Sequence, residues 1–126
     1  AYSDSGSMTW TYNSRNAYYT RIGKMLYWNF WFDTSKSGGT AGSSLMITGL
    51  PFPVKTATNY FGGASVAYAY RFNYDGAKMI GLRPDAGQTE MYVMKNDDDA
   101  VVGAFTGDAV DATNSRLIAS GWYNID

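Results

Sequence analysis

The sequence contains neither histidine nor cysteine, and these absences remove several classes of function. Without histidine the chain lacks the commonest general base and metal ligand, and without cysteine it has no disulfide bonds or thiolate ligands. The usual catalytic triads and zinc sites are therefore excluded. Glutamate is almost absent too, since Glu90 is the single one. Glycoside hydrolysis usually needs two carboxylates flanking the bond, and no aspartate has a pairing signature, so we expect neither an enzyme nor a cofactor.

The chain also lacks an excess of charge and a long apolar run. Lysine and arginine total 10 against 11 for aspartate and glutamate, a formal net charge of −1. No basic stripe is available to neutralise phosphates, so nucleic acid is not an expected partner. The longest apolar stretch, 25–32, is far shorter than the roughly 20 residues of a membrane-spanning helix, and the first residues do not form a signal peptide. We expect a soluble chain without membrane insertion, and the missing initiator methionine suggests a piece of a longer protein.

Aromatic residues and glycine are abundant in the 126 residues, with 17% aromatic residues and 14 glycines. Runs with period two recur from end to end between clusters of Gly, Pro, Asn, Asp and Ser, and no stretch keeps a helical period. This pattern predicts one all-β domain over residues 1–126, with 1–7 as a linker or shaft remnant. The expected strands are 8–12, 16–22, 24–33, 44–48, 64–74, 77–82, 88–94, 100–105 and 114–124.

About nine short strands with this many aromatic side chains predict an antiparallel two-sheet β-sandwich, jelly-roll-like, because one sheet cannot hide them. In the third expected strand, alternation separates two faces. One face has Leu26, Trp28, Phe30 and Phe32, and the other has Met25, Tyr27 and Trp31. Both faces need shelter from water. We expect one to pack in the sandwich core and the other against a second copy of the chain.

The fifth expected strand alternates large and small residues. Its expected large face consists of Val66, Tyr68, Tyr70, Phe72 and Tyr74, and the opposite face is small and polar. Small residues allow close approach by another layer or subunit. Arg71, on the small face, is expected either to pair with an acidic residue of a neighbouring copy or to face solvent, because burying it unpaired is costly.

Three stretches follow one another along the chain: "YTRIGKMLYWNFWF" followed by a Ser/Gly loop, then "LMITGLPFP", and finally "NSRLIASGWYNID". In this order they resemble the C-terminal receptor-binding domain of bacteriophage tail fibres and related virion fibres. The resemblance covers nearly the whole chain from Met8 onward. It implies a compact β-sandwich that forms a homotrimer at a virion fibre tip, extracellular after release, and binds a host-surface glycan or protein. The motifs themselves look structural: Gly23 serves a tight turn, 49–52 turn a corner, and Gly121 permits close packing.

Strands that alternate in direction from end to end assign every loop to one of two ends. Loops 13–16, 34–44, 74–77 and 95–99, with the C-terminus, are then expected together, opposite loops 22–24, 49–63, 83–87 and 106–113. Near the first end lie residues that can stack on sugars or bond their hydroxyls: Trp31, Asp33, Tyr74, Asp75, Lys95, Asp97 and Trp122. These residues are the predicted glycan-binding site. The alternative for Trp31 and Trp122 is packing in the core or an interface, which is commoner for aromatics in strands.

The run "NDDD" at 96–99 has the oxygen ligands that Ca²⁺ prefers but lacks the spacing of a calcium loop, so a solvated turn without metal is expected. The chain is therefore predicted to be a homotrimeric, non-enzymatic attachment domain that binds a host-cell glycan. One alternative is a structural trimerisation or folding cap that contacts no receptor. A second is a glycan depolymerase. A third, a cellular trimeric jelly roll of the tumour-necrosis-factor or complement type, lacks the "GLPF" landmark.

Overall fold

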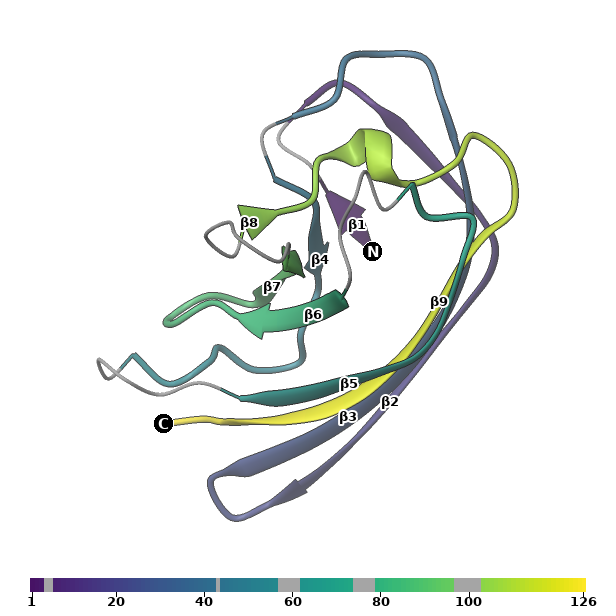
Figure 1. Cartoon of the computed structure of the whole chain (residues 1–126). Coiled ribbons are helices and arrows are strands. Elements are labelled where there is room, and N and C mark those ends of the chain that lie inside the picture. The colour runs from purple at the N-terminus through teal and green to yellow at the C-terminus, as the bar shows by residue number, and fades with distance from the viewer. Residues whose placement is uncertain (4–5, 43, 57–61, 74–78, 97–102) are drawn as a thin grey trace.

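The computed structural model describes residues 1–3, 6–42, 44–56, 62–73, 79–96 and 103–126. Within these ranges the chain forms two packed antiparallel sheets with nine strands (Figure 1), which confirms the predicted two-sheet β-sandwich. The four-stranded sheet, called here the long-strand sheet, has the order β2-β3-β9-β5. Its strands are Thr9–Ile22, Met25–Ser37, Ser115–Asn124 and Gly63–Tyr70.

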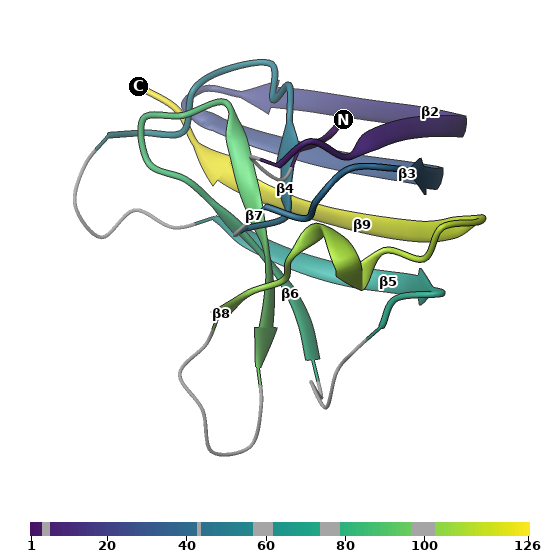
Figure 2. The ribbon, with the colours of Figure 1, turned by 90° about the horizontal axis from the view of Figure 1, so that it is seen from above.

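The second sheet, called the short-strand sheet, has the order β1-β4-β7-β6, with β8 also paired to β7. Its strands are Tyr2–Ser3, Met46–Thr48, Glu90–Asn96, Met79–Pro84 and, for β8, Gly103–Ala104. A 3-10 turn, η1 (Gly107–Ala109), precedes β9. The long-strand sheet curves around the short-strand sheet, and the strands of the two sheets run across one another (Figure 2). No helix in the described residues is long and apolar enough for a membrane span.

The inner face of β3 forms the centre of the core, as alternation predicts. Leu26, Trp28, Phe30 and Phe32 are all buried. The Phe30 ring stacks between those of Trp28 and Phe32, with centroids 5.4 and 4.5 Å away. Ile47 of β4 and Met91 and Val93 of β7 complete the core from the other sheet. Burying such side chains contributes roughly 1.5–3 kcal/mol each, so this face is a main source of stability.

The predicted turn at 13–16 is wrong, because β2 runs unbroken through it. The pairing with β3 shifts register between Tyr12 and Ser14, which leaves Asn13 as a bulge. Its side-chain amide donates to Asn114 Oδ1 at 2.9 Å, across the end of β9. A bulge adds one residue without ending the strand, so turn-forming residues are compatible with it.

The predicted large face of β5 is also wrong. A second register shift, between Val66 and Tyr68, changes which side chains face the core. Val66 and Ala69 pack against the core, whereas Tyr68 and Tyr70 are exposed and stack on each other with centroids 6.3 Å apart. The small inward residues allow β5 to lie close to the core.

The predicted gathering of loops at two ends fails for two segments. The C-terminus lies beside the 23–24 turn, where Ile125 N donates to Lys24 O at 2.9 Å. Segment 106–113 lies at the opposite end of the long-strand sheet, where Lys36 N donates to Ala112 O at 3.3 Å. The cause is that the sheets cross, so the connection from β8 to β9 does not simply reverse the direction of the chain.

Residues 1–7, expected to be a linker or shaft remnant, include β1 of the short-strand sheet. Tyr2 and Ser3 pair with Ile47 and Met46. The Tyr2 side chain is buried, and its ring meets that of Phe32 edge-on at 5.4 Å. The beginning of the described chain is therefore part of the sandwich.

Three tyrosines in or beside the core make the free energy of unfolding depend on pH in the alkaline range. Burial raises the pKa of Tyr2, Tyr12 and Tyr123 above the ordinary value of 10.0. The unfolded chain ionises first and binds fewer protons above pH 10, so this stabilisation is complete below pH 10 and is lost as pH rises toward the raised pKa values. We expect the free energy of unfolding, measured with urea on either side of pH 10, to fall with rising pH. Tyr123→Phe should reduce that slope, and an unchanged slope would contradict the assignment.

Candidate receptor-binding surface

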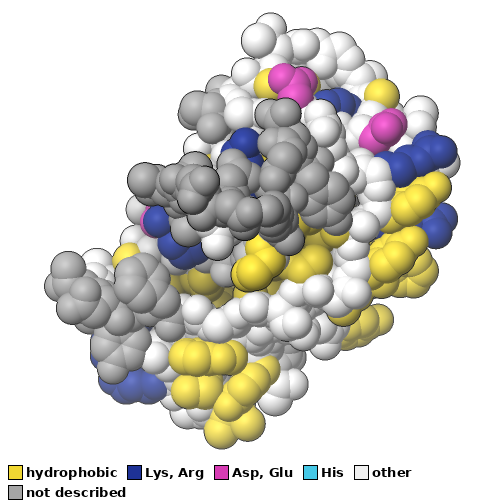
Figure 3. All heavy atoms as spheres, in the orientation of Figure 1, with side chains coloured by type: hydrophobic (Ala, Val, Ile, Leu, Met, Phe, Trp, Pro, Cys, Tyr) yellow, Lys and Arg dark blue, Asp and Glu magenta, His cyan; other side chains and the backbone are white. Residues whose placement is uncertain are grey.

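The convex side of the long-strand sheet, called here the outer face, carries much of the exposed apolar surface. Hydrophobic side chains gather along this flank of the molecule (Figure 3). Eight large side chains on it are at least 36% exposed: Tyr18, Ile22, Tyr27, Trp31, Tyr68, Tyr70, Ile118 and Trp122. Single exposed apolar residues are ordinary, but a contiguous group of this kind indicates a contact surface.

Strand pairing arranges the outer face in rows that cross β2, β3, β9 and β5. The rows are Ser14, Asp33, Arg116 and Tyr70; Asn16, Trp31, Ile118 and Tyr68; Tyr18, Asn29, Ser120 and Ser65; and Thr20, Tyr27, Trp122 and Gly63. Rings thus alternate with short polar side chains along β3. Such a mixed surface can pack against another protein or stack on sugar rings.

The Asp33–Arg116 ion pair limits what Asp33 can offer to a ligand. Arg116 Nε donates to Asp33 Oδ2 at 3.1 Å, and the Asn13 amide donates to Asp33 Oδ1 at 3.4 Å. Arg116 is half-exposed, whereas Asp33 is buried. Both carboxylate oxygens therefore have partners within the chain, and the Asp33 side chain links β3 to β9 through its ion pair with Arg116.

The structure brings together only part of the predicted glycan site. Trp31 and Asp33 are alternate residues of β3 and share the outer face, where Trp31 is 43% exposed. Trp122 is on the same face but pairs with Tyr27, four residues from Trp31 along β3 or roughly 13 Å. Lys95 belongs to β7 of the short-strand sheet, with its Nζ 6.0 Å from the Phe105 ring centroid. Tyr74, Asp75 and Asp97 lie outside the described residues.

Sequence reasoning missed several members of the outer face. Tyr68 and Tyr70 were expected to share a face with Val66, but the bulge in β5 separates them from it. Ile118 had a usable sequence signal, because it lies between the apolar residues Leu117 and Ala119 and alternation turns it to the opposite face of β9. Because Ile118 pairs with Trp31 of β3, both side chains lie on the outer face.

A separate hollow of 510 Å³ opens beside β2, at one end of the strand order. Ala17 and Tyr19 line one side of it, Leu50 and Pro51 the other, and core residues form its floor. The hollow is mainly apolar, so it suits a hydrophobic side chain better than a charged group. Across the described part of the chain, no three Asp or Glu side chains come together as a metal site.

The fold is shared with the solved structure of a tailspike protein. The Dettilon tailspike protein gp208 matches 99% of this chain with a TM-score of 0.76 and 16% sequence identity. The chain spans about a fifth of that protein, since the match covers 22% of the tailspike chain. No protein-family model matches the sequence, and no curated protein matches it significantly. The likeness establishes a common sandwich architecture.

Proposed function

We propose that this chain is part of a phage tail protein on the virion, where it forms a homotrimer and binds a glycan on the host cell surface. The observation that carries this proposal is the fold likeness to a tailspike segment over nearly the whole chain. The motifs at Tyr19–Lys24, at 45–52 and at 120–123 support it, because they resemble those of fibre receptor-binding domains. The role proposed is binding, without catalysis by this domain.

The outer face supports the trimer. Eight large apolar side chains on one side of a single chain leave a surface that a neighbouring copy would cover. Tryptophan and tyrosine contribute strongly to protein contacts, and both are present on the outer face. Its alternating Asn and Ser residues can supply hydrogen bonds between copies.

Three copies would also explain how weak sugar contacts become useful. A single sugar unit binds weakly, but linked sites on one rigid assembly raise the effective concentration for the second and third contacts. A host surface with many glycan copies then holds the virion by avidity.

The test is the solution mass of the chain by light scattering, followed by a glycan array. We expect a mass near three times 13.9 kDa, stable on dilution, and binding to a restricted set of glycans. A monomer at every concentration would contradict the trimer. A stable trimer that binds no glycan or host cell would favour the structural-cap alternative.

The depolymerase alternative is distinguished from simple binding by whether the polysaccharide is cleaved. Polysaccharides that bind on the array should show no loss of viscosity and no release of reducing ends after incubation with the trimer. Release of reducing ends would overturn the non-catalytic role.

A further inference from the structure

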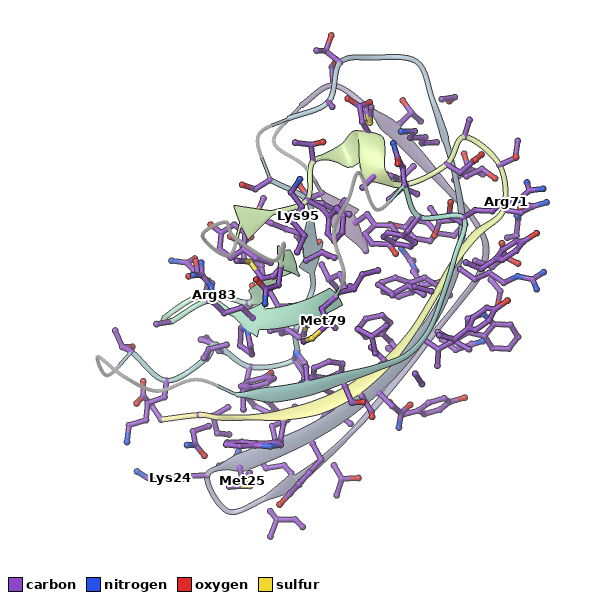
Figure 4. All side chains as sticks on the ribbon, viewed as in Figure 1. Lys24, Met25, Arg71, Met79, Arg83 and Lys95 are labelled. Carbon is purple, nitrogen blue, oxygen red and sulfur yellow. The ribbon has the colours of Figure 1, made fainter. Side chains whose placement is uncertain are left out.

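A polar notch of 420 Å³ lies at the end of the sandwich where β3 and β5 end and β9 begins. Its walls are segments 71–73 and 108–112, together with Lys36 at the end of β3. Arg71 lies at the opposite end of the molecule from Lys24 and Met25 (Figure 4). The notch is distinct from the outer face and from the hollow beside β2.

Backbone hydrogen bonds hold the two walls of the notch together. Asp111 N donates to Arg71 O at 3.1 Å, and Asn73 N donates to Ala109 O at 2.7 Å. Phe72 and Val110 form a bridge between the walls, and both side chains are buried. The two walls are therefore held in place relative to each other, with the side chains of the bridging residues buried beneath the notch.

Two cations at the rim are positioned by the chain. Arg71 Nη1 donates to Thr113 O at 3.1 Å and to Thr113 Oγ1 at 2.9 Å. Lys36 Nζ donates to Gly107 O at 3.0 Å and lies 3.7 Å from Asp108 Oδ1. The lysine ammonium and the arginine guanidinium are donors only.

Two carboxylates complete the rim. Asp111 Oδ1 accepts from Thr113 N at 2.9 Å, and this backbone hydrogen bond is the main cause that lowers the pKa of Asp111. The positive charges of Arg71 and Lys36 act in the same direction. Asp111 is therefore an ionised acceptor at neutral pH. Asp108 is largely exposed and presents a second acceptor.

From this arrangement we infer that the notch binds one neutral sugar unit of the glycan, an inference that rests on the proposed attachment function. Sugar hydroxyls donate as well as accept, so they match a rim that has two carboxylates and two cationic donors. The formal charges of the four rim groups cancel, which gives an anionic sulfate or phosphate no net attraction. A volume of 420 Å³ is within the range of small-ligand sites.

The test compares Arg71→Asn and Asp108→Asn with the wild-type chain. Asparagine tolerates the left-handed backbone of residue 71, where φ is 55°, so the first variant removes the guanidinium while keeping the local conformation. Asp108→Asn removes a charge from an exposed side chain. We expect each to weaken binding of the array-selected glycan about tenfold or more, with solution mass and thermal unfolding unchanged. Arg83→Asn, on the other sheet, is the matched control and should bind as the wild type does.

Three outcomes separate the inference from the proposed function. Unchanged affinity in both notch variants, with wild-type glycan binding intact, overturns the notch and leaves the attachment function standing. A wild-type chain that binds no glycan overturns the attachment function, and the inference with it. Competition by inorganic sulfate or phosphate, but not by neutral monosaccharides, overturns the neutral-sugar assignment.

Discussion

Gly121→Ala is expected to lower the free energy of unfolding by about 1–3 kcal/mol, the usual cost of overpacking. Gly121 lies in β9, between β3 and β5. A Cβ there would overlap the backbone oxygen of Gly63 and lie 2.6 Å from Trp28 Cζ2. The Trp28 ring cannot easily move away from the added Cβ, because it stacks on Phe30 in the core.

Gly81→Ala is the matched control, since Gly81 is also inside a strand. Its nearest obstacle is Met94 Cβ at 4.0 Å, an ordinary contact distance. Alanine also reduces the conformational freedom of the unfolded chain, so this variant should be neutral or slightly stabilised. Urea unfolding of both variants measures the contrast. A Gly121→Ala chain as stable as Gly81→Ala would show that β9 and β5 are less closely packed than described.

The close packing at Gly121 and the inner face of β3 could both be predicted from sequence. The first follows from the resemblance to fibre domains, and the second follows from strict alternation along 25–32. Alternation fails where a bulge intervenes, because one extra residue exchanges inside for outside. The bulges at Asn13 and near Ala67 have turn-like or small residues, which do not distinguish a bulge from a turn or a regular strand.

The predicted site needed more than strand positions. Trp31 and Trp122 were correctly assigned to strands, but their separation depends on how β9 pairs with β3. Lys95 was grouped with Trp31 by assuming that all strands run between two common ends. The sheets cross instead, and no local residue pattern encodes the crossing of two sheets (Figure 2). The notch was missed for the same reason, since Arg71 and Asp111 meet only through the packing of two distant connections.

Two adjacent residues of β3 are expected to fail in different ways when replaced. Phe30 is 6% exposed and stacks between two rings, so Phe30→Ala should lower the free energy of unfolding by about 3–5 kcal/mol. Trp31 is 43% exposed on the outer face, so Trp31→Glu should change the stability of the single chain by only about 0.5 kcal/mol. Urea unfolding at protein concentrations low enough to keep the chains apart measures the free energy of unfolding of both variants.

Trp31→Glu should instead prevent assembly of the proposed trimer. Loss of a central aromatic contact costs about 2 kcal/mol or more at each contact, so three contacts lose about 6 kcal/mol. Since each 1.4 kcal/mol is tenfold, the association constant should fall by about 10⁴-fold, and light scattering should report a monomer. Tyr19→Glu places the same charge on the side of β2 that lines the hollow, and it should remain trimeric. If Tyr19→Glu dissociates while Trp31→Glu does not, the copies meet through the hollow beside β2, and the outer face is then the surface left open to a ligand.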